Sequence, residues 1–451
     1  MLPREVVTSP DTTREAALKK ILVLCPTRRE YRDLPALAEA LGCEIIFDEF
    51  CGDYFDRFLC RHPPTDLRPL DMLALIDDTV DRYRDAGLSG ITSGVGYPGM
   101  SVCSIIAQAL HLPGPTAHSV LSCEHKYYSR LAQQRFVPHA VPEFRLLDPK
   151  KPLPAAERIR FPVFVKPVKS CMSMNAHRVE DARKLRNVLP VALLPEGFTK
   201  PFDEMLKTYT TYPLGTSYLL VESLLEGAQV SLEGYVHRGN VHVMGILDAI
   251  MFPGTLSFER FQYPSRLSEA VQVRMTDIAR TLMTGLGYDN APFNIELFYD
   301  ERTDRIHVIE VNPKIASQFA DLFMKVDGRS TFSVLLQLAL GQEPQFESGM
   351  GEFKLAASCV LRTSEDKRVV TTPSEQTIAA IEADYPGAKI EIHATPGRNL
   401  SDQMQDAQSF RYGLVNIGAG SGGELEDKFA RIARRLDFEL APVRSPVAVT
   451  G

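Results

Sequence analysis

The chain has 451 residues, of which 44% are hydrophobic and 24% charged, which is typical of a globular protein of roughly two to four domains with a large core. Its net charge of -7 argues against a nucleic-acid partner, and no apolar run reaches the ~18 residues of a membrane helix, so we expect no membrane partner. The eight cysteines form no C-x-x-C pair, and Met1–Glu15 lacks the apolar centre of a signal peptide, which predicts a cytoplasmic protein with reduced thiols.

Apolar strands alternate with amphipathic helices at the start of the chain. Strands and helices are expected, in chain order, at Lys20–Cys25, Leu34–Leu41, Cys43–Phe47, Gly90–Ser93 and Ser101–Leu110. This alternation of strands and helices predicts a doubly wound parallel sheet.

A glycine-rich turn, Gly94-Val-Gly-Tyr-Pro-Gly99, lies inside this region and formally fits G-x-G-x-x-G. It does not follow the first strand, and Pro98 interrupts it. We therefore interpret it as a strand-to-helix turn that faces the substrate, with a nucleotide site as the alternative.

The next segments end in charged side chains. Ser122 is predicted to begin a helix that carries Lys126 and Arg130 on one face, because the two residues are four apart. Two strands then end at Lys166 and at Glu222, where their side chains can project into a cleft. A first hairpin is expected to turn at Arg238-Gly-Asn240 and a second at Asp300–Asp304.

The second hairpin carries the most informative cluster. Strand alternation places Asn294 and Glu296 on one face, and Glu310 and Asn312 together on the facing strand. Folding about the turn predicts that Glu296 lies diagonally near Glu310, ~7–8 Å away. Oxygen ligands without thiolate or imidazole suit Mg²⁺, so Glu296, Glu310 and Asn312 are candidate metal ligands. The alternative is a solvated hairpin face.

The ordered motifs resemble the ATP-grasp superfamily, and most closely its carboxylate–amine ligases, including the L-amino acid ligases, and its biotin-carboxylase-like branch. The matching motifs are Lys126, Phe161-Pro-Val-Phe-Val-Lys-Pro167, Val221-Glu-Ser-Leu-Leu-Glu-Gly227, Phe293-Asn-Ile-Glu296 and Ile309-Glu-Val-Asn-Pro-Lys314. The resemblance implies an α/β and α+β multidomain fold, in which the N-terminal parallel sheet is followed by lid and catalytic parts and a C-terminal α+β segment. The implied divisions are an N-terminal domain 1–118, a linker helix 119–141, a lid 142–216, a catalytic part 217–345 and a C-terminal segment 346–451.

The resemblance also implies roles for the matching residues. Lys126 and Lys166 would bind ATP phosphates, assisted by backbone groups at Ser170 and Ser173. The adenine would lie against Val221, Glu222, Ser223 and Leu225, with Glu222 near its exocyclic amine. Glu296, Glu310 and Asn312 would hold Mg²⁺, with Mn²⁺ as a substitute, and Lys314 would stabilise the transferring phosphoryl group and the acyl phosphate.

Three positions depart from the family pattern. The loop Val168–Asn175 contains no glycine, although family lid loops are rich in it. Gln229 stands where many members have a ribose-binding glutamate. Lys314 stands where many members have arginine. A guanidinium group that can form two parallel hydrogen bonds is thus replaced by the single compact charge of an ammonium group.

These features predict an ATP-dependent enzyme that activates a carboxylate as an acyl phosphate and joins it to an amine, with ATP and Mg²⁺ as cofactors. The partners expected are a small carboxylate and a small amine, and the resemblance implies a homodimer. Arg260, Arg266 and Lys325 are candidates to clamp a substrate carboxylate, with a structural role as the alternative. Two other functions stay open: a bicarbonate-dependent carboxylase similar to biotin carboxylase, and a non-catalytic ATP-binding sensor or assembly protein.

Overall fold

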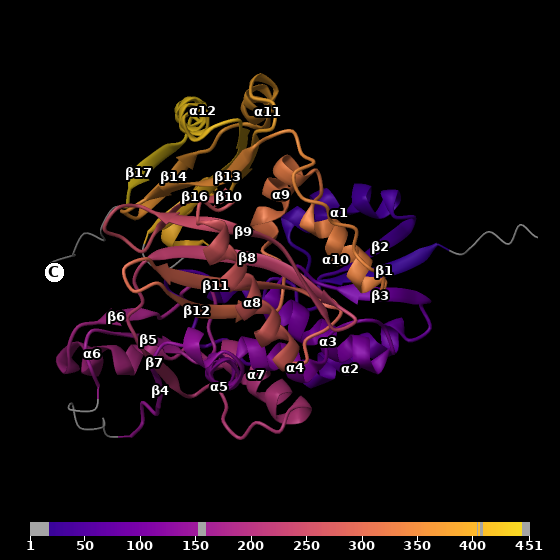
Figure 1. The fold of residues 1–451 in the computed structure, drawn as a ribbon, viewed down its shortest axis with the longest axis vertical. Coiled ribbons are helices and arrows are strands. Elements are labelled where there is room, and N and C mark those ends of the chain that lie inside the picture. The colour runs from indigo at the N-terminus through magenta and orange to yellow at the C-terminus, as the bar shows by residue number, and fades with distance from the viewer. Residues whose placement is uncertain (1–17, 152–158, 404, 406–408, 444–451) are drawn as a thin grey trace, which may run out of the picture.

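The computed structural model describes residues 18–151, 159–403, 405 and 409–443 (Figure 1). Its N-terminal part is the predicted parallel sheet, in which β1 (Lys19–Leu24) pairs with β2 (Cys43–Asp48) on one side and with β3 (Leu88–Thr92) on the other. The helices of this part are α1 (Arg28–Ala40), α2 (Met72–Tyr83) and α3 (Ser101–Ala109), with short turns at η1 (Asp56–Phe58) and η2 (Gly96–Met100). The glycine-rich turn therefore follows β3 and leads into α3, as the sequence predicts.

The expected linker helix is two helices rather than one. α4 (Ala117–Glu124) ends before His125, whose extended backbone separates it from α5 (Lys126–Phe136). The prediction that a helix begins at Ser122 is therefore wrong, because Thr116 caps α4 and Ser122 lies near its end. Lys126 and Arg130 still share one face, since both belong to α5.

A small antiparallel sheet follows, after the turn η3 (Pro138–Ala140), in the strand order β4-β7-β5-β6. Its strands are β4 (Phe144–Leu147), β7 (Leu219–Ser223), β5 (Val163–Pro167) and β6 (His177–Val179). Two helices, α6 (Ala182–Ala192) and α7 (Glu196–Tyr209), come between β6 and β7. This sheet lies beside the edge strand β12 of the large sheet (Figure 1).

The large sheet has the strand order β12-β11-β8-β9-β10-β13-β16-β15. The strands of its first part are β8 (Ala228–His237), β9 (Asn240–Met251), β10 (Phe258–Tyr263), β11 (Ala291–Asp300) and β12 (Arg305–Asn312). Both predicted hairpins are present. The apolar face of β11, with Phe293, Ile295 and Leu297, packs in one core with residues of α8 (Glu269–Gly285), which leaves the polar face toward the small sheet.

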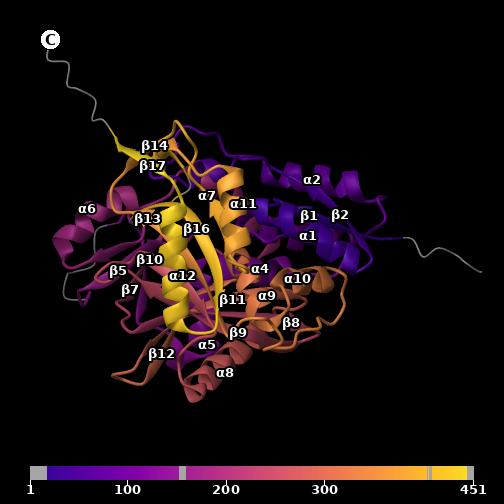
Figure 2. The same ribbon diagram turned by 90° about the horizontal axis from the view of Figure 1, so that it is seen from above.

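The C-terminal strands continue this large sheet. β13 (Leu355–Thr363) pairs with β10, and β16 (Phe410–Ala419) and β15 (Lys389–Ile392) extend the sheet further. The sequence-based view of a separate segment from Lys354 onward is therefore wrong for these strands. The remaining elements are β14 (Lys367–Thr371), which pairs with β17 (Glu439–Pro442), and α11 (Glu375–Asp384), η6 (Leu400–Asp402) and α12 (Gly422–Arg435). In the view from above, α11 and α12 lie over β16 (Figure 2).

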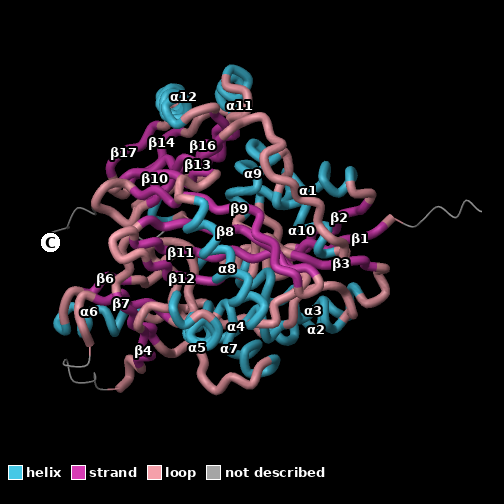
Figure 3. The backbone as a smooth tube through the Cα atoms, in the orientation of Figure 1, coloured by secondary structure: helices cyan, strands magenta, loops and turns pink. Residues whose placement is uncertain are grey.

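Two helices connect the large sheet to the N-terminal sheet. After η5 (Ser317–Phe319), the helices α9 (Ala320–Asp327) and α10 (Thr331–Ala339) run between them (Figure 3). Phe332 and Leu335 of α10 share one core with Ile21 and Val23 of β1. The mixed α/β architecture expected from the sequence is confirmed. Of the helices in the described part of the chain, none has the length and apolarity to cross a membrane.

Candidate active site

The two strands of the second hairpin bring their acidic residues directly opposite each other. Glu296 of β11 pairs with Glu310 of β12, and Asn294 pairs with Asn312. The register shifts after Glu296, where the pairing passes over Ile309 and forms a β-bulge. The predicted diagonal arrangement is therefore wrong, because the bulge moves Glu310 into line with Glu296. Directly opposed residues have Cβ atoms about 4.5–5.5 Å apart, which is closer than the diagonal estimate.

The opposed carboxylates differ in their electrostatic surroundings. Burial and the neighbouring Glu310 raise the pKa of Glu296 above its usual value. Burial also opposes ionisation of Glu310, but Lys126 and Lys166 outweigh it and lower the pKa of that carboxyl. Gln229 Nε2 donates to Glu296 at 3.2 Å, and Asn312 Nδ2 donates to the Asn294 amide oxygen at 2.9 Å. The side chains at the hairpin face are thus held in place around the pair.

This donor set fits a hard divalent cation. Two carboxylates and an amide oxygen offer the oxygen ligands that Mg²⁺ and Mn²⁺ prefer, and a cation between them would offset their mutual repulsion. Across residues 18–151, 159–403, 405 and 409–443, no group of three or more His, Cys, Asp or Glu residues is placed to hold a metal. A cation at the hairpin would therefore depend on two carboxylates, the Asn312 amide and oxygens from a phosphate or water.

Helix α5 delivers two cations to this hairpin from one face. Lys126, its first residue, forms an ion pair with Glu310 and donates to the Ser170 carbonyl oxygen at 3.0 Å. Arg130 donates to the carbonyl oxygens of Val308 at 2.9 Å and Ile309 at 2.8 Å. Arg130 thus satisfies the carbonyl groups at the bulge that aligns the carboxylates, a role that the sequence analysis missed.

Arg130 and Lys166 share a carboxylate on the small sheet. Glu222, at the end of β7, forms ion pairs with Arg130 Nε and, at 2.8 Å, with Lys166 Nζ. Burial would raise the pKa of Glu222, but the two cations outweigh it and lower the pKa to about 2. Both oxygens of Glu222 are engaged by cations, so its side chain orients Lys166. The placing of adenine against Val221, Glu222, Ser223 and Leu225 stays a prediction.

The glycine-free loop after β5 is held at its beginning. The Lys126 backbone N–H donates to the Val168 carbonyl oxygen at 2.8 Å, and Ser170 is buried. Further along, Met172, Ser173 and Asn175 have positive φ values of 48°, 56° and 53°. Glycine adopts this region without steric cost, so the loop keeps a glycine-like backbone path although its residues have side chains. Ser173 is exposed and lies on this path.

Lys169 in the same loop is a further buried cation that the sequence analysis did not single out. Its ammonium lies 2.6 Å from a carboxylate oxygen of Glu124, at the end of α4. It also lies 4.2 Å from the ring centroids of both Tyr97 and Phe202. This combination of an ion pair and two aromatic faces attaches the loop to the N-terminal part of the chain.

Lys314 follows β12 and lies beside the glycine-rich turn. A Cβ built on Gly96 would lie 3.4 Å from Lys314 Cδ and 3.2 Å from Glu124 Oε1. The Lys314 ammonium makes a long contact of 3.4 Å with the Ile315 carbonyl oxygen, which leaves it able to bind an anion. The turn, Glu124 and Lys314 therefore meet next to the hairpin that carries the carboxylates.

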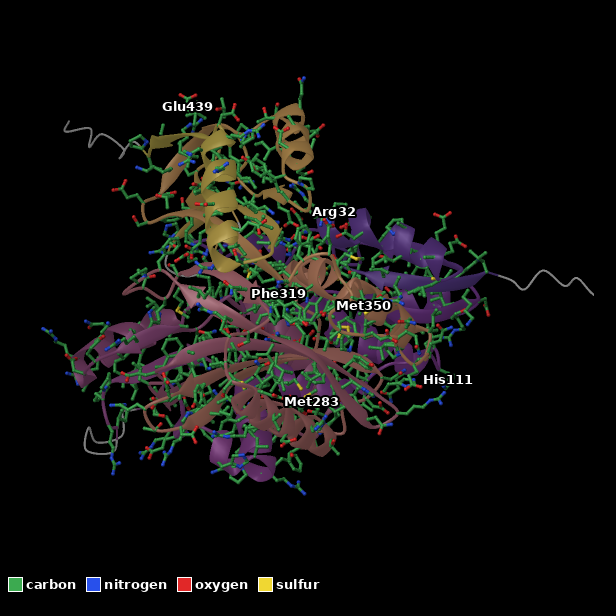
Figure 4. All side chains as sticks on the ribbon, turned by 45° about the horizontal axis from the view of Figure 1, so that its top comes forward. Arg32, His111, Met283, Phe319, Met350 and Glu439 are labelled. Atoms are coloured by element: carbon green, nitrogen blue, oxygen red, sulfur yellow. The ribbon has the colours of Figure 1, made fainter. Side chains whose placement is uncertain are left out.

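The three proposed carboxylate clamps are engaged elsewhere. Arg266 pairs with Asp248 at 3.0 Å, Lys325 pairs with Asp321 in its own helix, and Arg260 pairs with Glu259. Their structural alternative is therefore favoured over substrate binding. Arg29 is a further basic residue that the sequence analysis did not single out, and it donates to Ser317 Oγ at 3.2 Å. It is bound to Glu391 at 2.6 Å, and its neighbour Arg32 lies at the same junction of α1 with the C-terminal strands (Figure 4).

Residues 159–323 match the family model described as the ATP-grasp domain. The match spans Lys166, the residues 221–225, the hairpin carboxylates and Lys314, and it begins after Lys126. The resemblance inferred from the sequence motifs is thereby confirmed.

Solved structures share this fold over nearly the whole chain. The L-amino acid ligase from Bacillus licheniformis has 18% identity and a TM-score of 0.68, with 93% of this chain and 98% of the ligase covered. Phosphoribosylglycinamide synthetase from Anaerococcus prevotii has 14% identity and a TM-score of 0.62, with 93% and 99% covered. The biotin carboxylase domain of Hydrogenobacter thermophilus 2-oxoglutarate carboxylase, in complex with MgADP, ADP and bicarbonate, has 14% identity and a TM-score of 0.64, with 94% and 91% covered. At these identities the likeness establishes the fold.

Proposed function

We propose that this chain, whose residues 159–323 match the ATP-grasp domain, is an ATP-dependent carboxylate–amine ligase that releases ADP and phosphate. The observation that carries the proposal is the opposed pair Glu296 and Glu310, with the cations of Lys126, Lys166 and Lys314 around it. Carboxylates beside several cations form a site for a polyphosphate and its metal ion, which is what phosphoryl transfer requires.

Each residue of the site has its own role in the proposed reaction. Lys126 and Lys166 bind the phosphates, and Gln229 orients Glu296. Glu296, Glu310 and Asn312 would hold Mg²⁺, which neutralises charge on the phosphates when bound. Lys314, the least engaged of these lysines, stabilises the negative charge on the transferred group.

The chemistry proceeds in two displacements. A carboxylate oxygen of the acid forms a bond to the γ-phosphorus of ATP, and the bond to the bridging oxygen breaks to release ADP. The amine then attacks the acyl carbon, phosphate leaves, and a proton is released as the amide forms. The buried Lys126, Lys166 and Lys169 help to exclude water from the acyl phosphate. The enzyme would work in the cytoplasm on small molecules, as a homodimer.

The test is ADP and phosphate release with Mg-ATP across pairs of amino acids, other small carboxylates and amines. Release that needs both an acid and an amine, with their condensation product detected by mass spectrometry, is the expected result. Glu310→Ala should lower turnover on the order of 100-fold or more, because a metal ligand is lost. Glu301→Ala, in the exposed turn of the same hairpin, is the matched control and should keep turnover.

Two other outcomes would replace the proposal. Release of ADP that depends on bicarbonate and needs no amine would indicate a carboxylase. Tight ATP binding with no ADP from any pair would indicate a sensor or assembly protein.

A further inference from the structure

Three strands of the large sheet place polar residues in one row beside the opposed carboxylates. The members of this row lie directly opposite one another, and they are Glu233 of β8, Asn294 of β11 and Asn312 of β12. Asn312 is the amide that would complete the metal site. Glu233 lies at the other end of the row, is fully buried, and has no part in the reaction steps described above. The row therefore connects a buried carboxylate with a ligand of the cation.

Both carboxylate oxygens of Glu233 accept hydrogen bonds. Oε1 accepts from Asn294 Nδ2 at 2.6 Å, and Oε2 accepts from the Ala316 backbone N–H at 3.2 Å. Burial raises the pKa of Glu233 to about 7, although the Ala316 N–H, Lys314 and Asn294 all favour the charged form. Above that pH the carboxylate can only accept hydrogen bonds, so both of its partners must present donors.

This requirement fixes the orientation of two side-chain amides in turn. Because the Asn294 nitrogen faces Glu233, its oxygen faces the next strand, where it accepts from Asn312 Nδ2 at 2.9 Å. The same Asn312 nitrogen lies 3.5 Å from Glu296 Oε1. The Asn312 nitrogen is thus directed at these two acceptors, and Oδ1 is the atom left for a cation. A reversed Asn312 amide would present an N–H group to the cation instead.

The second partner of the Asn294 nitrogen does not fix this orientation. Ser231 Oγ lies 2.6 Å from Asn294 Nδ2, but a hydroxyl group can donate or accept and so suits either orientation of the amide. Of these two partners, only Glu233 accepts without being able to donate. The carboxylate therefore determines which atom of Asn294 faces it.

We propose that Glu233 is a positioning residue, which sets the orientation of Asn312 through Asn294 so that an oxygen faces the cation. The inference rests on the metal site of the proposed function and adds a buried residue on which that site depends. The same carboxylate holds the segment after Lys314, because Ala316 follows that lysine by two residues. Hydrogen bonds that orient a metal ligand in this way are typically worth about 10- to 100-fold in metal affinity.

Glu233→Gln would break this arrangement with little change in shape. The amide has one acceptor oxygen for two donors, so its own NH₂ group must face either Asn294 Nδ2 or the Ala316 N–H. Reversing the Asn294 amide relieves the first conflict, but it places nitrogen against Asn312 Nδ2 and reverses Asn312 in turn. Adding Asn294→Asp restores the polarity. The carboxylate at 294 then accepts from the amide at 233 and from Asn312, while the oxygen at 233 still accepts from Ala316.

The test measures the affinity for a non-hydrolysable ATP analogue by calorimetry, with Mn²⁺ or with a chelator, at about pH 8.5 so that Glu233 is ionised. The wild-type protein should bind the analogue more tightly with Mn²⁺. Glu233→Gln should bind the Mn²⁺ complex about 10- to 100-fold more weakly than the wild type, but the metal-free analogue equally well. The double variant Glu233→Gln with Asn294→Asp should recover most of the loss.

Two further variants separate orientation from charge and from burial. Asn294→Asp alone sets two acceptors against each other at Glu233, so it should bind the Mn²⁺ complex more weakly than the wild type. Asp327→Asn is the matched control, because Asp327 is also a buried carboxylate that accepts from a backbone N–H, that of Gly349 at 2.7 Å. It lies at the end of α9, outside the hairpin, and should keep the affinity gained with Mn²⁺.

Several outcomes would overturn the inference while leaving the ligase standing. They are equal binding of the Mn²⁺ complex by Glu233→Gln and the wild type, equal losses with and without Mn²⁺, and a double variant that folds but binds no better than Glu233→Gln. Tighter binding of the Mn²⁺ complex by Asn294→Asp alone would also overturn it, because charge would then explain the recovery.

The two proposals can fail separately. No gain from Mn²⁺ in the wild-type protein would overturn the inference together with the metal site of the proposed function. A gain from Mn²⁺ that depends on Glu233, without ADP release from any pair of substrates, would support the inference and count against the ligase.

Discussion

Replacing Glu222 with glutamine should make the protein less stable at neutral pH and change its response to acid. The fall in the pKa of Glu222 from 4.5 to about 2 corresponds to on the order of 3 kcal/mol of stability. Glu222 is 5% exposed, so solvent screens this interaction little. The variant also leaves Arg130 and Lys166 without their shared carboxylate, which adds to the loss.

The sign of the pH effect follows from the lowered pKa. A carboxyl whose folded pKa lies below its unfolded pKa stabilises the protein above the unfolded value of 4.5, and this contribution is lost as the pH falls toward about 2. By the same linkage, roughly half of it should be gone at about pH 3. The difference in stability between wild type and Glu222→Gln should therefore shrink between about pH 7 and about pH 3.

Urea unfolding, followed by circular dichroism at several pH values, measures this difference. Glu426→Gln is the control, because Glu426 is largely exposed and its ion pair with Arg260, at 3.4 Å, is a weak surface contact. That variant should change stability by less than about 1 kcal/mol. A Glu222→Gln protein as stable as the wild type at neutral pH, or equally destabilised at every pH, would refute the reasoning.

Two further predictions concern backbone positions. Gly227→Ala should lower the free energy of unfolding by roughly 2–4 kcal/mol, because Gly227 has φ +121° and its Cβ would lie 2.1 Å from the Tyr299 carbonyl oxygen. Gly239 has φ +77° with open space around it, so Gly239→Ala should lower the free energy of unfolding by only about 1 kcal/mol, and equal melting temperatures for the two variants would contradict this prediction. Ser173→Gly should raise the free energy of unfolding by on the order of 0.5–1 kcal/mol, and with it the melting temperature, because it removes a serine side chain from the left-handed conformation at φ 56°. Asn175→Gly should bring no such gain, because asparagine tolerates this region and Asn175 Nδ2 donates to the Val191 carbonyl oxygen at 3.1 Å, so a larger gain there than at Ser173 would disprove the strain argument.

Local patterns predicted the strands and the shared faces, but not how the strands align. The alternation around Glu296 was sufficient to place the acidic residues on one face. The register depends on the bulge at Ile309, whose carbonyl oxygen accepts a hydrogen bond from Arg130, 179 residues earlier. A tertiary contact of this kind leaves no periodic signal in the hairpin itself. For the same reason the pairing of β10 with β13 was missed, since each strand reads as an ordinary strand on its own.

The same limit applies to the site. Lys166 was identified because it stands at the end of a strand, Glu310 because strand alternation placed it beside Asn312, and Lys126 because it matches the ordered family motifs. Lys169 and Glu124 are not marked by such positions, and they meet only when the loop after β5 packs against α4. The available signal was a second lysine three residues after Lys166, but the sequence analysis considered Lys169 only as part of the loop Val168–Asn175.

The contacts of Arg130 have a mechanical consequence. Its guanidinium binds Glu222 on the small sheet and the carbonyl oxygens of Val308 and Ile309 on the large one. A swing of the small sheet relative to the large one would keep all of these bonds only if it turned about this guanidinium, which would then act as a pivot. β6 and α6 lie at the far end of the small sheet and would move most, whereas Lys166 shares Glu222 with Arg130 and would keep its position. One arginine would thus let the small sheet turn without releasing Lys166 from Glu222.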